Sequence, residues 1–237
     1  MSERKNNKKY TFTVEGCTEK WYFDWLKNTI NSIPESVYSV SIDAKVQQNR
    51  LKFAKAVNPI AVPSAVHICD YESNDDVHVQ KFRGILDQLD KANKLKGRSF
   101  QYSLGYSNFT FELWMVLHKI DCNGTLIDRT QYLKHINRAY NANFENLAHY
   151  KNEADFKWCL NQLSINDVKS AIARSIKIMD MNRQNNVAMR SYKGFEYYID
   201  NPSLTIWKSV EKILDDCGLA DKTIAARAEC GTRRAEE

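Results

Sequence analysis

The stretch that decides the fold is Ala65-Val66-His67-Ile68-Cys69-Asp70-Tyr71-Glu72, a short apolar run that ends in two carboxylates one residue apart. An apolar run without polar alternation is typical of a buried strand in a parallel sheet. The carboxylates would then lie at the carboxyl edge of the sheet, where open α/β proteins bind ligands. In an extended continuation Asp70 and Glu72 point to the same side, which favours a hard cation such as Mg²⁺ or Mn²⁺ between them. The alternative is a surface turn, in which residues 73–76 cap the next helix.

Length and composition limit the protein that this strand can belong to. The chain has 237 residues, of which 43% are hydrophobic, and a formal charge of +5. These values allow one sizeable core and permit a nucleic-acid partner without requiring one. The basic start (1–9) has no apolar run behind it, and no stretch approaches the roughly 20 apolar residues of a membrane span. Six scattered cysteines without CxxC spacing argue against a zinc site or a disulfide framework. The prediction is a cytoplasmic protein with no membrane segment.

The first half of the chain alternates between strand-like and helix-like patterns. The predicted elements are a strand at 10–14, a helix at 19–30, a strand at 37–46, a helix at 47–57, a strand at 65–69, a helix at 77–92 and a strand at 99–104. This order predicts an α/β core over residues 9–119, with a mostly parallel sheet and helices on both faces.

A further acid, Glu15, follows the first predicted strand directly. Gly16 allows a sharp turn there, and Thr18 is the predicted N-cap of the next helix. An isolated Glu at a helix start commonly only compensates the helix dipole. The second acidic strand end, at residues 70 and 72, favours a site shared by Glu15 and this pair.

The segment from Ser107 to His118 predicts a buried helix. Ser107 and Asn108 are the expected caps, and the residues that follow are apolar on nearly every side. Glu112 is the single acid within this helix. A buried carboxylate costs several kcal/mol unless it is paired or binds a metal. Two readings stay open, namely a third acidic element beside Glu15 and Asp70, or an ion pair with a lysine or arginine elsewhere.

Residues 120–218 predict a helical region that packs on the core, followed by a tail at 219–237. Predicted helices span 130–140, 153–162, 165–181 and 203–216. The stretch 169–193 holds six basic residues and one acid, and aromatic residues lie at its end. Basic residues beside aromatics suit phosphate contacts and base stacking. The candidate nucleic-acid contacts are Lys169, Arg174, Lys177, Arg183, Arg190 and Lys193, followed by Tyr192, Phe195, Tyr197 and Tyr198. The alternative is a solvated helix face with core aromatics behind it.

Four motifs together resemble the RloB family, also called the AbiL second component. They are Val14-Glu15-Gly16-x-Thr18-Glu19-x-x-Tyr22-Phe23, the pair Asp70 and Glu72, Ser107-Asn108-x-x-Phe111-Glu112-Leu113-Trp114-x-x-Leu117-His118, and Asn201-Pro202-Ser203-x-Thr205. The resemblance covers roughly residues 10–215 and implies a Toprim-like nuclease fold with an appended C-terminal helical region. This chain departs from the family pattern at two places. It has Asp-x-Glu where Asp-x-Asp is usual, and it has Phe109 where proline is usual.

The resemblance also implies a function and a set of site residues. Toprim enzymes place a glutamate after strand one and an acidic pair after strand three, which correspond to Glu15 and to Asp70 with Glu72. OLD-type Toprim nucleases add a second glutamate and a Ser/Glu element, which Glu19 and Ser107 with Glu112 match; Asn108 is a supporting residue. The implied catalytic residues are Glu15, Asp70 and Glu72, and the implied Mg²⁺ or Mn²⁺ ligands are Glu15, Glu19, Asp70, Glu72 and Glu112.

The implied activity is metal-dependent hydrolysis of phosphodiester bonds in DNA or RNA, tRNA included, in anti-phage defence beside an AAA-type ATPase partner. A second reading is a non-catalytic Toprim-like subunit that binds nucleic acid or a partner and signals with that ATPase. A phosphatase-like reading is disfavoured, because such enzymes place a nucleophilic aspartate after the first strand, where this chain has Glu15.

Overall fold

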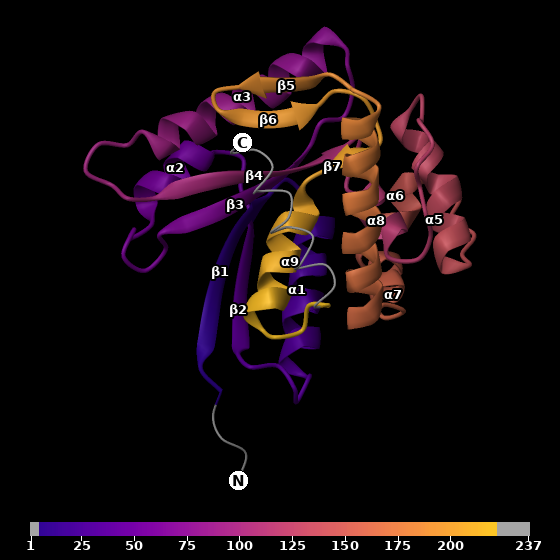
Figure 1. Ribbon diagram of the computed structural model, residues 1–237, viewed down its shortest axis with the longest axis horizontal. Coiled ribbons are helices and arrows are strands. Elements are labelled where there is room, and N and C mark those ends of the chain that lie inside the picture. Colours follow the sequence, from indigo (N-terminus) through magenta and orange to yellow (C-terminus); the bar gives the residue numbers. More distant parts are fainter. Residues whose placement is uncertain (1–4, 222–237) are drawn as a thin grey trace.

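A five-stranded sheet forms the centre of the computed structural model, which describes residues 5–221 (Figure 1). Its strands are β1 (Asn7–Val14), β2 (Ser39–Val46), β3 (Ser64–Asp70), β4 (Gln101–Asn108) and β7 (Ser203–Leu204). They lie in the order β2-β1-β3-β4-β7, and only β7 runs antiparallel to its neighbour. The predicted α/β class with a mostly parallel sheet is confirmed, and β3 is its central strand.

Helices cover both faces of the sheet, and further helices of the C-terminal half form an outer layer (Figure 1). The first half contributes α1 (Cys17–Asn31), α2 (Arg50–Ala56), α3 (Asp76–Asn93) and α4 (Glu112–Leu117). The second half contributes a 3₁₀ helix (Arg129–Gln131), α5 (Tyr132–Tyr140), α6 (Leu147–Tyr150), α7 (Glu153–Leu160), α8 (Ile165–Gln184) and α9 (Ile206–Asp216). No helix in this described part of the chain is long and apolar enough to cross a membrane.

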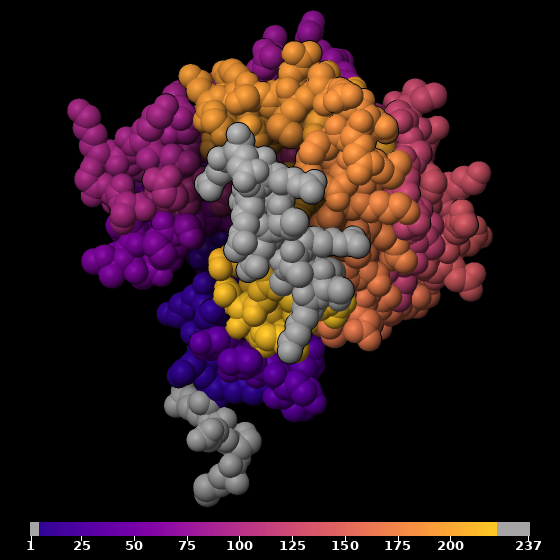
Figure 2. Space-filling view, in the orientation of Figure 1, coloured from indigo at the N-terminus to yellow at the C-terminus, as the bar shows by residue number. Residues whose placement is uncertain are grey.

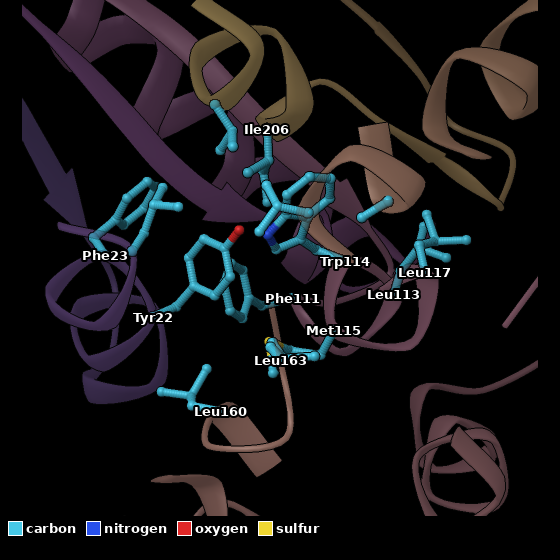
Figure 3. Close-up of a cluster of buried hydrophobic side chains, with 14 of the residues drawn as sticks. Tyr22, Phe23, Phe111, Leu113, Trp114, Met115, Leu117, Leu160, Leu163 and Ile206 are labelled. Atoms are coloured by element: carbon cyan, nitrogen blue, oxygen red, sulfur yellow. The ribbon is translucent and has the colours of Figure 1, made fainter. Parts of the chain in front are cut away.

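The alternating side chains of β3 divide the core into two clusters. Ile68 belongs to the cluster under α1, α4 and α9, whereas Cys69 belongs to the cluster under α2 and α3. At the centre of the first cluster, Tyr22 of α1 meets Trp114 of α4 edge to face, with ring centroids 6.0 Å apart (Figure 3). All six residues of α4 are buried, as the apolar pattern predicts.

The larger cluster joins the predicted core to the predicted helical region. It continues from α4 into α5, α7, α8 and α9. β7 also comes from the C-terminal part and completes the sheet. The region boundaries at 119 and 218 stay a prediction, and most of the predicted tail (222–237) lies outside the described residues.

Two expected helix caps have other roles. Ser107 and Asn108 are the last residues of β4, where they pair with Leu204 and Ser203. The strand continues past the predicted end at 104 because β3 pairs with residues 105–107 and β7, remote in sequence, pairs with Ser107 and Asn108. The predicted cap Thr18 lies inside α1, whose N-cap is Gly16. The Thr18 hydroxyl donates instead to Oε2 of Glu19, at 3.0 Å.

A short hairpin, β5 (Met189–Tyr192) and β6 (Phe195–Tyr198), was not predicted. Its turn residues Lys193 and Gly194 have φ values of 54° and 82°, the left-handed conformation that two-residue hairpin turns need. The hairpin and α8, both orange in Figure 2, form adjoining parts of one face of the molecule.

Candidate functional site

A pocket of about 370 Å³ opens where β1 and β3 end and α1 begins. Parallel strands bring their carboxyl ends to one edge of the sheet, so acids that follow different strands meet there. Four predicted site acids line this pocket, namely Glu15, Glu19, Asp70 and Glu72. Its other charged lining residues are Lys81, Arg129 and Lys151, and Thr110 and Gln48 add polar side chains.

Three carboxylates form the inner group of the site: Glu19 and Asp70 line the pocket, and the fully buried Glu112 raises the pKa of both without lining it. Glu19 lies in the first turn of α1 and is 5% exposed, Asp70 ends β3, and Glu112 opens α4 and is 0% exposed. Gly16 makes room for Glu19, because a Cβ on this residue would lie 3.0 Å from Oε2 of Glu19. Burial raises the pKa of Asp70 well above its usual range, and the charges of Glu19 and Glu112 raise it further. Burial likewise raises the pKa of Glu19, with a contribution from Glu112.

Lys151, directly after α6, is the cation beside these carboxylates. Its Nζ lies 3.0 Å from Oε1 of Glu112. Among the residues that the structure describes, neither Glu112 oxygen has a partner with hydrogen-bond geometry. When ionised, the three acids carry three negative charges against the single positive charge of Lys151. The inner group therefore has an excess of two negative charges, equal and opposite to the charge of one divalent cation. Both readings of Glu112 thus find support, because it pairs with a lysine and also lies within the acidic group.

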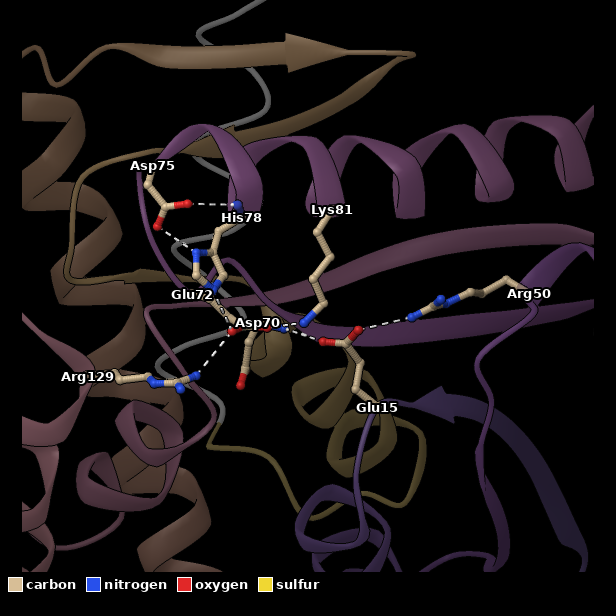
Figure 4. A network of polar contacts seen from close by, with 8 residues as sticks. All are labelled: Glu15, Arg50, Asp70, Glu72, Asp75, His78, Lys81 and Arg129. Atoms are coloured by element: carbon tan, nitrogen blue, oxygen red, sulfur yellow. Dashed lines mark hydrogen bonds and ion pairs between the residues drawn. The ribbon is translucent and has the colours of Figure 1, made fainter. Parts of the chain in front are cut away.

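Arg50, the first residue of α2, holds Glu15 in place (Figure 4). Its Nη2 donates to Oε1 of Glu15 at 3.0 Å, and its Nη1 donates to the Gln48 carbonyl at 2.8 Å. The backbone N–H of Asp70 donates to the other Glu15 oxygen at 3.2 Å. Both oxygens of Glu15 therefore have donors, and this side chain has a fixed orientation.

His67, on β3, fixes Arg50 in turn. The Nε of Arg50 lies 3.0 Å from Nε2 of His67, and Nδ1 of His67 lies 2.9 Å from the Thr13 hydroxyl. A guanidinium can only donate, so Nε2 must accept and the imidazole proton must sit on Nδ1. Burial and the Arg50 charge lower the pKa of His67 well below its usual range. His67 is therefore neutral and orients the arginine that positions Glu15.

Glu72 departs from the prediction that it points to the same side as Asp70. Its φ of 62° is left-handed, so the strand does not continue in extended form. The carboxylate contacts Lys81, lies 3.1 Å from Nη1 of Arg129 and lies 3.3 Å from Nε2 of His78 (Figure 4). These cations lower the pKa of Glu72 against the opposing effect of burial. The two acids of the pair thus occupy opposite electrostatic environments.

The alternative prediction, that residues 73–76 cap the next helix, is also confirmed. Asp75 is the N-cap of α3 and accepts from the backbone N–H of His78 at 3.0 Å. The turn after the acidic pair therefore starts α3 and brings His78 and Lys81 to Glu72. The helix cap and the acidic site coexist.

The donor chemistry of the site fits Mg²⁺ or Mn²⁺. The inner acids offer carboxylate oxygens, which hard cations prefer, and the buried Glu112 oxygens have no hydrogen-bond partner within residues 5–221. As the side chains lie, residues 5–221 hold no group of three or more His, Cys, Asp or Glu side chains arranged around one ion position. Glu15 and Glu72 face cationic partners, so a metal shared by the site acids would require their side chains to move from these positions.

The predicted nucleic-acid residues are spread over a long surface. Four of them lie on α8, whose 20 residues span about 30 Å, and two lie on the β5–β6 hairpin. The four on α8 have acidic neighbours: Lys169 has Asp221, Arg174 and Lys177 have Asp121, and Arg183 has Asp180. Tyr197 and Tyr198 are 4% and 3% exposed, so their predicted role as stacking surfaces is wrong.

Ser107 and Asn108 do not line the pocket, and their supporting role stays a prediction. Both are buried at the end of β4, and Asn108 donates to the Ile199 carbonyl at 2.8 Å. Sequence reasoning missed Arg50, Lys81, Arg129 and Lys151. None of these cations carries a spacing signal, because each comes from a different segment and meets the acids only in the folded chain.

The sheet and the acids at its strand ends define a Toprim-like α/β protein with a carboxylate-rich pocket. The chain belongs to the RloB-like family, because the model of the RloB-like protein family matches residues 10–213. The resemblance inferred from the motifs is confirmed. Comparisons with curated proteins and with solved structures gave no significant match.

Proposed function

We propose that this protein is a metal-dependent phosphodiesterase that cuts nucleic acid, DNA or RNA. The observation that carries the proposal is the inner carboxylate group. Glu19, Asp70 and Glu112 come from three different elements and, when all three are ionised, have an excess of two negative charges over Lys151. Such a group is costly to bury and is a poor choice for stability alone.

Each side chain has a distinct part in this proposal. Asp70, Glu19 and Glu112 would hold Mg²⁺ or Mn²⁺, which when bound lowers the pKa of a water and neutralises charge on phosphate oxygens. Glu15 stands at the pocket wall as a further ligand or as the proton acceptor, in the orientation that Arg50 imposes. Glu72 would join the ligands only after leaving Lys81 and Arg129.

The biological setting follows from the family. The RloB-like resemblance supports a cytoplasmic role in anti-phage defence, with an AAA-type ATPase as partner. A non-catalytic, nucleic-acid- or partner-binding subunit is the second candidate function. The observation in its favour is that Glu72, the second acid of the strand-end pair, faces Lys81, Arg129 and His78 instead of Asp70.

Incubation with plasmid, single-stranded DNA and total tRNA separates the two candidates. The phosphodiesterase should cut at least one substrate with Mg²⁺ or Mn²⁺ and none in EDTA. Asp70→Asn should abolish cleavage, whereas Asp43→Asn, which alters an exposed acid on β2, should leave it unchanged. Binding without cleavage of any substrate under these conditions would favour the non-catalytic subunit.

A further inference from the structure

The cations at the mouth of the pocket have no role in holding a metal. Lys81 and Arg129 line the pocket and are 54% and 52% exposed, and His78 stands beside them. They come from α3 and from the 3₁₀ helix before α5, segments almost fifty residues apart. All three surround a single carboxylate, that of Glu72.

A carboxylate and a phosphate present the same kind of group to a cation, a negatively charged set of oxygen acceptors. Arg129 and Lys81 contact different oxygens of Glu72, Oε2 and Oε1 respectively. Two cations that converge on separate oxygens of one anion are the arrangement that recognises a phosphate. The chain's own Glu72 occupies that position in this structure.

We propose that Lys81 and Arg129, with His78 beside them, form a binding site for a backbone phosphate of nucleic acid, and that Glu72 competes for this site. The inference rests on the proposed function for the identity of the ligand. The phosphate bound here is a neighbour of the phosphate to be cut, because Lys81 and Arg129 line the same pocket as Glu19 and Asp70.

The geometry also explains why the site has two charge zones. The inner group is acidic and would repel a phosphate in the absence of metal, whereas the rim is cationic and would attract one. Movement of Glu72 toward the inner acids would release Lys81 and Arg129 for substrate. The left-handed Glu72 lies between the two zones, directly after Tyr71 and two residues from Asp70.

Binding of a labelled oligonucleotide in EDTA tests the proposal without any cleavage step. Lys81→Gln and Arg129→Gln should each weaken binding and reduce the slope of log K against log[KCl] by about 0.7–0.9, the share of one phosphate contact. Matched controls are Lys91→Gln, exposed at the far end of α3, and Arg138→Gln, exposed in the last turn of α5. Both controls should leave the slope unchanged.

Glu72→Gln is the decisive variant. It removes the competing charge, so binding in EDTA should become about 5- to 10-fold tighter, a change that corresponds to one charged interaction. The gain should disappear when Glu72→Gln is combined with Arg129→Gln, because the released cation is then missing. Thermal melts of every variant verify that the fold is retained.

Three outcomes would overturn the inference. They are unchanged salt slopes in Lys81→Gln and Arg129→Gln, unchanged affinity in Glu72→Gln, and displacement of the oligonucleotide by an equimolar mononucleotide, which would assign the site to a small phosphate ligand. The test is independent of the proposed activity. If the variants change binding as expected but the protein cleaves no substrate, the proposed phosphodiesterase activity is contradicted and the proposed phosphate site is supported.

Discussion

The ammonium nitrogen of Lys151 lies 3.0 Å from Oε1 of Glu112, although the lysine side chain is 39% exposed and the glutamate side chain is 0% exposed. The pair is therefore asymmetric, because water can still reach the lysine but not the acid. Burial opposes the charge of Lys151, yet Glu112, Asp70 and Glu19 together raise its pKa. Lys151 thus interacts with three carboxylates, and this interaction influences the stability of the protein without metal.

Replacement of Glu112 by glutamine should leave the metal-free protein as stable as the wild type or more so. The change removes one of three mutually repelling acids and does not strand Lys151, which keeps its access to water and its other acidic neighbours. The stabilisation gained on addition of Mn²⁺ should fall, since a ligand is lost. Thermal melts in EDTA and in Mn²⁺ measure both effects. A loss of about 3 kcal/mol or more in EDTA would instead identify Glu112 as half of a purely structural ion pair.

The contribution of Asp70 to the stability of the metal-free protein should rise as the pH falls from neutral toward the ordinary carboxyl pKa of about 4. The pKa of Asp70 is raised by burial and by Glu19 and Glu112, so the folded state binds more protons than the unfolded state in this window. The free energy of unfolding therefore increases as the pH drops through the raised pKa, and the full gain is reached below the ordinary pKa.

Urea unfolding in EDTA across this pH range, for the wild type and for Asp70→Asn, isolates the effect. The difference between the two proteins removes contributions of opposite sign from Glu72 and Asp75, whose pKa values are lowered. Saturating Mn²⁺ should reduce the pH dependence of the wild-type free energy of unfolding, because the cation takes the place of the proton on Asp70. Parallel curves for the two proteins in EDTA would show that Asp70 does not bind the proton.

Arg50→Lys should lower Mn²⁺ affinity by about 10- to 100-fold, the usual cost of losing a group that orients a metal ligand. A lysine has one nitrogen and cannot contact Glu15, His67 and the Gln48 carbonyl together. Calorimetric titration with Mn²⁺, at a temperature where the variant is folded, measures the change.

Arg98→Lys is the matched control for this experiment. Arg98 donates from Nη1 to the Ala54 and Val57 carbonyls at the end of α2, and so supports the same helix without contacting the site acids. This variant should lose stability and keep its Mn²⁺ affinity. Equal losses of Mn²⁺ affinity in the two variants would mean that the position of α2 as a whole, and not the Arg50–Glu15 contact, determines the affinity.

The basic segment of α8 and the hairpin remains a predicted nucleic-acid surface. Replacement of Arg183, Arg190 and Lys193 by glutamine should weaken oligonucleotide binding and lower its salt dependence, since each lost phosphate contact removes part of the slope. Fluorescence anisotropy over a range of KCl concentrations measures this. An unchanged salt dependence of binding would mean that the segment is solvated surface, which agrees with the ion pair between Arg183 and Asp180.

The sequence by itself determined the parallel α/β core and the acids at its strand ends. Apolar runs such as 65–69 fix the strands locally, and residues directly after a strand must lie at one edge of a parallel sheet. Glu15 and Asp70 could therefore be brought to one pocket from their positions in the chain, whereas Glu19 was added by the family resemblance. Glu112 could be recognised as a buried acid, because the residues around it in α4 are apolar on every side.

Tertiary structure alone decided the partners of these acids. Lys151, Arg50 and Arg129 approach from segments whose packing depends on contacts remote in sequence, so no local pattern places them. The direction of Glu72 depended on a single backbone angle, its left-handed φ, which turned the second acid toward the rim cations. Likewise β4 extends past residue 104 because β3 pairs with it as far as Ser107 and β7, ninety-five residues later, pairs with Ser107 and Asn108.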